Sequence, residues 1–146
     1  HYNSNYKYNQ INEIMREIRY RGIGIAERKW VFGSLWFDTR NKATLIWSEE
    51  LKYWVRVDPA TVGQYTGLKD EHGKEIYEGD VIRSPLSEDK TRPHRIFYHT
   101  GNAAFMGALV DRKELCYLRL DQDWIYKFGK EVIGNIHDNP ELLKNE

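Results

Sequence analysis

The chain has 146 residues, of which 40% are hydrophobic and 14% aromatic, and its 22 basic side chains balance 22 acidic ones. This composition excludes an intrinsically disordered chain, and the net charge of zero excludes the strongly basic balance of a dedicated nucleic-acid-binding protein. Cys116 is the single cysteine, which excludes an intrachain disulfide and a multi-thiolate metal site within one chain. Because no apolar run approaches the roughly 20 residues that span a bilayer, and no signal-peptide pattern is visible, we expect a cytoplasmic protein without membrane contact.

The N-terminal segment, residues 1–14, is polar and rich in Asn and Tyr, and we expect it to form an arm appended to the main domain. Ile11, Ile14, Met15 and Ile18 have the i, i+3, i+4, i+7 spacing of an amphipathic helix face. This spacing predicts a helix followed by a strand. The alternative is a strand that begins near Met15, where apolar and charged residues alternate.

The next stretch, from Arg28 to Val57, is rich in aromatic and β-branched residues and predicts several strands. Its last segment, LKYWVRV, alternates in a way that predicts two strand faces. One face would carry Leu51, Tyr53, Val55 and Val57, and the other would carry Lys52, Trp54 and Arg56. Asp58-Pro59 ends this strand, because proline cannot donate to a β-ladder.

This half of the chain offers more aromatic surface than one small barrel needs to enclose, from Trp30, Phe32, Trp36, Trp47 and Trp54. Ordering an arm costs about 1–2 kcal/mol of backbone entropy per residue, so apolar burial has to offset that cost. We therefore hypothesise that Tyr6, Tyr8, Ile11 and Ile14 pack on this aromatic surface, in their own subunit or in a neighbour's.

The central segment VGQYTGLKDEHGKEIYEGDVI, residues 62–82, predicts turn geometry rather than a catalytic loop. Asp70 and Gly73 suit a type I turn in which Gly73 takes a positive φ. Leu68-Lys69 should therefore pair with Glu75-Ile76 across a hairpin.

A second turn, Glu78-Gly79, leads into a strand that begins at Asp80. A carboxylate beside glycine commonly accepts turn amide protons, and no nucleophile or histidine stands next to Asp80, so a structural role is favoured over a general base. The structural turn signature of this segment is Gly63, Gly67, Asp70, Gly73, Gly79 and Asp80.

The C-terminal part begins with SPLSEDKTRPH, which is polar, is broken by prolines and predicts an exposed loop. Further strands are predicted at residues 95–99, 104–110, 115–120 and 131–136. Asn139-Pro140-Glu141 then supplies a helix N-cap, a proline at the first helical position and an acid near the positive end of the helix dipole, so a short C-terminal helix is expected. The chain as a whole is predicted to be mainly β, with a β-rich α+β fold as the alternative.

Three segments resemble the YopX family, whose small proteins are found in phages and prophages: MREIRYRG, VDPATVGQYTGLKDEHGKEIYEGDVI and EVIGNIHDNPELL. The resemblance runs from about Met15 to Leu143 and is dense in the centre and at the end. It implies a phage-related cytoplasmic protein with a small SH3-like β-barrel around the central motif, and it carries over no catalytic residues. We expect a single YopX-like domain over residues 15–146, with the barrel centred on residues 57–140.

Candidate catalytic and metal-binding residues are few. His94 and His99 flank a predicted strand at an odd separation, so their side chains would point to opposite faces, and we interpret both as surface histidines. Asp121 and Asp123 would share a strand face that suits a hard cation, but no third ligand is evident, which favours a solvated acidic edge. We therefore expect no catalytic residue, metal or cofactor, and a metal-assisted hydrolase using these two aspartates is a distant alternative.

Two basic clusters are candidates for binding a partner or a nucleic acid. Trp54 stands between Lys52 and Arg56 on one predicted strand face, a combination that stacks bases and neutralises phosphate in small barrels that bind single strands. The competing interpretation is that Trp54 packs beneath the arm or a second subunit. The other cluster is Lys90, Arg92 and Arg95, which neighbouring acids partly cancel.

These patterns predict a noncatalytic binding or assembly module, and homo-oligomerisation would bury its exposed aromatic side chains. The alternative is a small nucleic-acid-binding barrel with those side chains open on one basic face. With no net charge, we expect nucleic-acid binding to be weak or absent, with duplex affinity no tighter than about micromolar.

Overall fold

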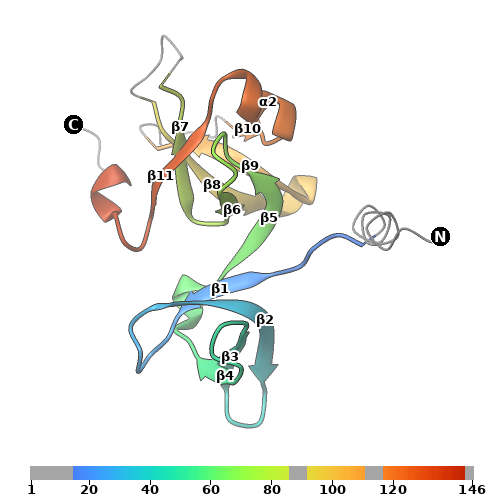
Figure 1. The fold of residues 1–146 in the computed structure, drawn as a ribbon, viewed down its shortest axis with the longest axis vertical. Helices are drawn as coiled ribbons and strands as arrows, with labels where there is room; N and C mark the ends of the chain where they lie inside the picture. The colour runs from blue at the N-terminus through green and yellow to red at the C-terminus, as the bar shows by residue number, and fades with distance from the viewer. Residues whose placement is uncertain (1–14, 86–91, 111–116, 144–146) are drawn as a thin grey trace, which may run out of the picture.

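The computed structural model describes residues 15–85, 92–110 and 117–143, which form two antiparallel β-sheets and one short α-helix (Figure 1). The first sheet has the strand order β4-β3-β2-β1-β5-β6. Its strands are β1 (Tyr20–Ile23), β2 (Trp30–Asp38), β3 (Ala43–Ser48), β4 (Trp54–Arg56), β5 (Gly63–Lys69) and β6 (Glu75–Tyr77).

The second sheet has the strand order β10-β9-β8-β7-β11. Its strands are β7 (Asp80–Arg83), β8 (His94–His99), β9 (Ala104–Leu109), β10 (Tyr117–Arg119) and β11 (Glu131–Asn135). The helices are α2 (Gln122–Lys127) and the 3₁₀-helices η1 (Pro59–Thr61), η2 (Thr100–Asn102) and η3 (Pro140–Leu143).

The ribbon divides into two halves (Figure 1), and the described residues form a hydrophobic core in each of them. We call residues 20–62 the N-terminal half and residues 63–143 the C-terminal half. The N-terminal core consists of Val31, Ile46, Val55 and Val57, which alternate along their strands with outward-facing residues. The C-terminal core consists of Ile76, Ile82, Ile96, Leu120 and Ile125. Strands β1 and β5 pair with each other, so the first sheet runs through both halves.

The expectation of a mainly β protein is confirmed, but a closed SH3-like barrel centred on residues 57–140 is not found among the described residues. In that range β5 and β6 extend the first sheet, and β11 takes the free edge of β7 in an open second sheet. The closest approach to closure lies in the N-terminal half. There an isolated bridge joins Gly24 to Val57 and draws the end of β4 back toward β1.

Strand β4 is shorter than the strand expected at residues 51–57. The Ser48 N–H donates to the Tyr53 carbonyl (3.0 Å), and the Lys52 N–H donates to the Ser48 carbonyl (2.9 Å), which closes the β3–β4 loop. Lys52 has a φ of 61°, outside the β region, so it does not lie on the strand face predicted for it. Leu51 and Tyr53 belong to the same loop and are 42% and 49% exposed, so they do not share the buried face either.

The central hairpin forms as its turn residues predict, with Lys69 opposite Glu75. Gly73 has a φ of 83°, and its N–H donates to the Asp70 carbonyl (3.0 Å). The buried carboxylate of Asp70 accepts two amide protons within the turn and a third from Val132 (3.1 Å) on β11. Asp70 therefore also ties the hairpin to the second sheet.

The C-terminal half contains a helix that the sequence interpretation missed. Asp121 is the N-cap of α2 and accepts a hydrogen bond from the Trp124 N–H (2.8 Å), while Asp123 lies in the first helical turn. The prediction that these two aspartates share a strand face is therefore wrong. The helix expected after Asn139 is present as the 3₁₀-helix η3, in which the Leu142 N–H donates to the Asn139 carbonyl (3.0 Å).

Some predictions fall on residues outside the described ranges, namely the arm at residues 1–14, Lys90, and residues 115–116 of the strand expected at 115–120. Met15 and Ile18 are described, and they are exposed and belong to no helix or strand. The described part of the predicted helix face therefore does not form a helix, and the strand that was expected to follow begins at Tyr20.

We expect Gly73→Val to lower the free energy of unfolding by more than about 1 kcal/mol. A Cβ at Gly73 meets no atom within 4 Å, so the cost comes from the positive φ, which strains a β-branched residue. A thermal melt measures it. The matched control is Glu71→Val in the same turn, at a residue without a positive φ. Equal melting temperatures for the two variants would contradict the turn assignment.

Candidate binding groove

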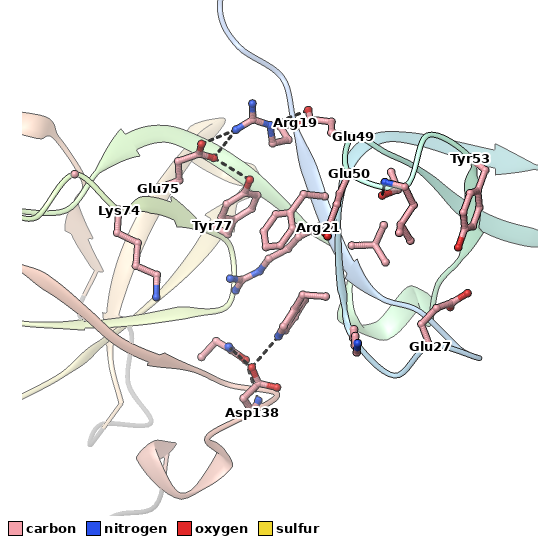
Figure 2. A pocket seen from close by; sticks show the side chains of 18 residues that line it. Arg19, Arg21, Glu27, Glu49, Glu50, Tyr53, Lys74, Glu75, Tyr77 and Asp138 are labelled. Atoms are coloured by element: carbon pink, nitrogen blue, oxygen red, sulfur yellow. Dashed lines mark hydrogen bonds and ion pairs between the residues drawn. The ribbon is translucent and has the colours of Figure 1, made fainter.

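A groove of about 1010 Å³ lies where the two halves meet (Figure 2). The N-terminal half contributes β1, the start of β2 and the β3–β4 loop, and the C-terminal half contributes the β5–β6 hairpin and the turn after β11. Figure 2 shows Lys74, Glu75, Tyr77 and Asp138 on one side, Glu27, Glu49, Glu50 and Tyr53 on the other, and Arg19 and Arg21 between them.

Arg21 on β1 forms the buried centre of the groove. Its guanidinium carbon lies 4.5 Å from the centre of the Trp30 ring and 4.9 Å from that of Tyr77. Its Nη2 is 2.9 Å from the Asp80 carboxylate and donates to the Glu78 carbonyl at 3.3 Å. Both partners of the ion pair are buried, with side chains 8% and 2% exposed. The strand alternation explains the placement, because Arg21 lies on the face of the sheet opposite the Val31 core.

Asp80 is a structural residue in this arrangement. Its carboxylate accepts the Tyr77 N–H (2.8 Å) as well as pairing with Arg21. Burial raises the pKa of Asp80, while Arg21 and the Tyr77 amide act in the opposite direction. The expected role as an acceptor of turn amide protons is confirmed, and the ion pair to Arg21 is an addition that the sequence did not reveal.

The glycines of the turn signature let the chain approach these groups closely. Gly63 lies opposite Arg21, and a Cβ there would come 2.6 Å from the Glu78 carbonyl oxygen. Gly79 and Gly67 have φ values of 89° and 84°. These positions therefore shape the backbone around the ion pair and the hairpin.

Arg19 forms a second charged cluster, closer to solvent. Its guanidinium contacts Glu75 (2.5 Å) from the C-terminal half, Glu49 (3.0 Å) from the N-terminal half, and Glu17 (2.6 Å). The Tyr77 hydroxyl donates to Glu75 at 2.9 Å. Burial and the neighbouring Glu75 raise the pKa of Tyr77, so its phenol stays protonated at neutral pH and is a poor general base.

Trp30 connects the groove to the turn after β11. Its indole Nε1 donates to the Asp138 carboxylate (2.7 Å), which also accepts from Asn135 Nδ2 (2.9 Å). The hydrogen bond from Trp30, followed by that from Asn135, lowers the pKa of Asp138. The nearby His137 packs its ring 5.8 Å from Trp30, and burial followed by the Arg21 charge lowers its pKa.

The groove carries charges of both signs. Its lining includes five carboxylates and four cations: Glu27, Glu49, Glu50, Glu75 and Asp138, against Arg19, Arg21, Lys29 and Lys74. Arg21 is already neutralised by Asp80, and Arg19 by glutamates. A polyphosphate would therefore meet carboxylates in this groove, whereas a polypeptide with mixed side chains would find partners for both signs.

The predicted cluster of Lys52, Trp54 and Arg56 lies outside the groove lining. Trp54 contacts two further tryptophans on the outer side of strands β2 to β4, with ring centres 5.4 Å from Trp36 and 5.6 Å from Trp47. Arg56 pairs in register with Leu45, which also pairs with Trp36. We call Trp36, Leu45, Trp47, Trp54 and Arg56 the tryptophan face. Lys52 is in the loop at one end of it.

The second predicted cluster is only partly described, because Lys90 lies outside the described residues. Arg95 is on β8, with its guanidinium carbon 5.5 Å from the centre of the Phe97 ring, and Arg92 precedes that strand. Neither lines the groove.

The two histidines of β8 have different environments. The prediction of a surface site is wrong for His94, which is 5% exposed and packs against Trp124, with ring centres 5.9 Å apart. His99 accepts the Asn102 N–H (3.0 Å) and caps η2.

The groove residues that sequence reasoning missed are Arg21, Trp30, Tyr77 and Asp138. They come from segments that are distant in the sequence, and their contacts depend on how the two halves dock. The sequence contained one local indication of a buried arginine, since Arg21 lies between Tyr20 and Gly22-Ile23 in a short strand. Within the described residues, no three His, Cys, Asp or Glu side chains are grouped to hold a metal. None of the helices in the described segments is long and apolar enough to cross a membrane.

We expect Arg21→Met to lower the free energy of unfolding by about 3–5 kcal/mol, because it leaves Asp80 buried without its cation. The double variant Arg21→Met/Asp80→Asn should lose less than the sum of the single variants, since asparagine removes the buried charge and keeps an acceptor for the Tyr77 amide. Urea unfolding measures this cycle. Arg83→Met on the exposed side of β7 is the control, with a change within about 0.5 kcal/mol. Strict additivity would rule out the coupling.

A pH series tests the hydrogen bond from Trp30 to Asp138. Because the pKa of Asp138 is lowered in the folded state, this carboxylate contributes stability above its unfolded pKa of about 4, and that contribution is lost as the pH falls through the lower folded value. Trp30→Phe removes the donor. Its stability deficit relative to the wild type should be largest at neutral pH and should shrink below about pH 4.

Trp47→Phe is the control for this series, because its ring contacts Trp54 and none of the described acids or histidines is hydrogen-bonded to it or packed on it. Its stability deficit should stay constant over the same pH range. Chemical denaturation at several pH values measures both variants. A Trp30→Phe deficit that is independent of pH would contradict the assigned role of the hydrogen bond.

Comparison with known proteins identifies the family to which the chain belongs. The chain is similar to protein EF1440 from Enterococcus faecalis, whose crystal structure matches with a TM-score of 0.58 and 26% sequence identity over 89% of this chain and 100% of that chain. Among proteins with curated descriptions, none matches the sequence. The family model described as YopX protein matches residues 5–144, nearly the whole chain, and the protein therefore belongs to the YopX family.

Proposed function

We propose that this YopX-family protein is a noncatalytic binding or assembly module of phage or prophage origin, and that its groove holds an extended segment of a partner protein. The observation that carries the proposal is the groove at the junction of the two halves. It has about 1010 Å³ of space, exposed aromatic rings and charges of both signs. Phe32 and Tyr53 are 40% and 49% exposed and offer apolar contact to a ligand. The phage origin rests on the family.

The architecture of the N-terminal half together with β5 supports a finer proposal, that residues 20–69 form an SH3-like module. Strands follow the order β4-β3-β2-β1-β5, and the 3₁₀-helix η1 stands between β4 and β5. The bridge from Gly24 to Val57 curls the sheet around its own core. Modules of this type bind extended peptides in aromatic-lined grooves, which agrees with a polypeptide ligand.

The chemistry of the groove supports a noncatalytic role. Asp80 is tied to Arg21, and Glu75 is tied to Arg19 and Tyr77, so these carboxylates are engaged in holding the structure. The distant alternative is a metal-assisted hydrolase using Asp121 and Asp123, and these residues lie at the start of α2 instead of on the strand face expected for them. A second copy of the chain is one candidate for the partner.

Selection of peptides from a random library on the full-length protein tests this function. We expect enriched peptides to combine apolar residues with lysine or arginine, because carboxylates outnumber cations in the groove lining. Fluorescence polarisation then gives the affinity of each enriched peptide. Tyr53→Ala should weaken binding at least fivefold, because a large exposed ring is lost from the groove.

The matched control for this experiment is Tyr126→Ala, because Tyr126 on α2 is 55% exposed, against 49% for Tyr53, and does not line the groove. It should bind the peptides as the wild type does. Enriched peptides whose affinity is indifferent to Tyr53→Ala would contradict the assignment of the groove, and a library without any enriched peptide would contradict peptide binding itself.

A further inference from the structure

The tryptophan face lies on the same side of the first sheet as Arg21, but its residues do not line the groove. Trp36, Trp47 and Trp54 are 48%, 37% and 42% exposed, whereas the intervening Ile46 and Val55 are at most 2% exposed. The alternation of the strands therefore turns three indole rings outward, on the side opposite the N-terminal core. Exposing adjacent large aromatic rings is costly in water, which marks the face as a binding surface.

Cations surround this face without acidic partners. Arg56 lies on it, Lys52 is in the loop at one end, and Arg40 and Lys42 are in the β2–β3 turn at the other end. None of these four side chains forms an ion pair with a described residue. Three acids lie near the face. Asp38 accepts amide protons within its own turn and keeps its charge, Glu49 contacts Arg19, and Glu50 is in the same loop as Lys52.

We propose that the tryptophan face binds single-stranded DNA, with bases stacked on the indole rings and phosphates neutralised by Arg40, Lys42, Lys52 and Arg56. Aromatic side chains stack any base, and cations along the same surface follow the backbone. Recognition of this kind needs only bases and phosphates. Among the residues in these register pairs on this side of the strands, Ser34, opposite Trp47, carries the hydroxyl group, so the face has little with which to prefer a ribose 2′-hydroxyl.

The charge on this face argues against two other occupants. A two-fold contact between copies of the chain would set the same four cations against one another. The N-terminal segment, residues 1–14, carries one lysine and one glutamate and so brings no net negative charge to the face. A nucleic acid supplies both the rings and the negative charge.

Fluorescence anisotropy of labelled dT12 with the full-length protein tests the proposal. We expect a dissociation constant in the micromolar range at 50 mM salt, and weaker binding to the duplex of the same length. With four cations engaged, the slope of log K against log salt should be about −2 to −3, from roughly −0.7 per phosphate contact on a single strand. Absence of dT12 binding up to about 1 mM protein would overturn the proposal.

Two variants separate stacking from charge. Trp54→Ala should weaken dT12 binding at least fivefold by loss of the central ring. Arg56→Gln keeps the rings, and it should weaken binding and reduce the steepness of the salt slope by about 0.7. Tyr126→Ala and Arg83→Gln, an exposed ring and an exposed cation elsewhere, should bind as the wild type does. If Trp54→Ala and Arg56→Gln also bind as the wild type does, the proposal fails.

The competing occupants are outcomes of the same experiment. Light scattering should give the same mass for the wild type and Trp54→Ala. A dimer that dissociates in Trp54→Ala, together with no bound oligonucleotide, would overturn the proposal in favour of a second copy. Tenfold tighter binding of U12 than of dT12 would overturn the assignment to DNA.

Discussion

The buried ion pair between Arg21 and Asp80 is the interaction on which the arrangement of the two halves depends. Arg21 belongs to the first sheet and Asp80 begins the second, and each would be a buried charge without its partner. Such a charge costs several kcal/mol, so neither half can dock in another orientation without exposing or isolating one of them. The rings of Trp30 and Tyr77 cover the guanidinium from the two halves. The shape of the groove follows from this single docking geometry.

Arg19 spans the same junction, but its ion pairs are partly exposed to solvent. It contacts Glu49 in one half and Glu75 in the other, and both carboxylates are partly exposed. Solvent screening limits such pairs to about 0–1 kcal/mol each. A bound partner can therefore exchange contacts with Arg19 at little cost, whereas exchange at Arg21 would open the buried pair. The junction thus combines a buried ion pair that stays fixed with exposed ion pairs at Arg19 that can rearrange. This combination suits the binding of varied side chains.

The sequence predicts structural features that depend on residues close together in the chain, and it does not predict features that depend on residues far apart in the chain. The hairpin at Asp70 and Gly73 is predictable because turn chemistry is local, and the outward placement of Trp54 and Arg56 follows from strand alternation. The helix α2 was missed because it has only six residues and depends on packing Ile125 into the C-terminal core. The β3–β4 loop was missed because Lys52, rather than a glycine, adopts the positive φ. The groove was missed because Arg21 and Asp80 meet only after the halves dock.

The neutral composition of the chain conceals two surfaces of different character. The groove is lined by both acids and bases, so its attraction for any one sign of charge is small. Near the tryptophan face, four cations without an ion-pair partner among the described residues lie beside the rings, with Asp38 and Glu49 close by. The net charge of the whole chain describes neither surface. A net charge of zero excludes a strongly basic protein, but it does not exclude a local binding site for phosphate. A face with four cations has limited affinity at physiological salt, since each contact is weakened by counterions. Occupancy of this face by a single strand would then depend on the local concentration of the strand. The partner proposed for the groove would raise that concentration if it carried such a strand.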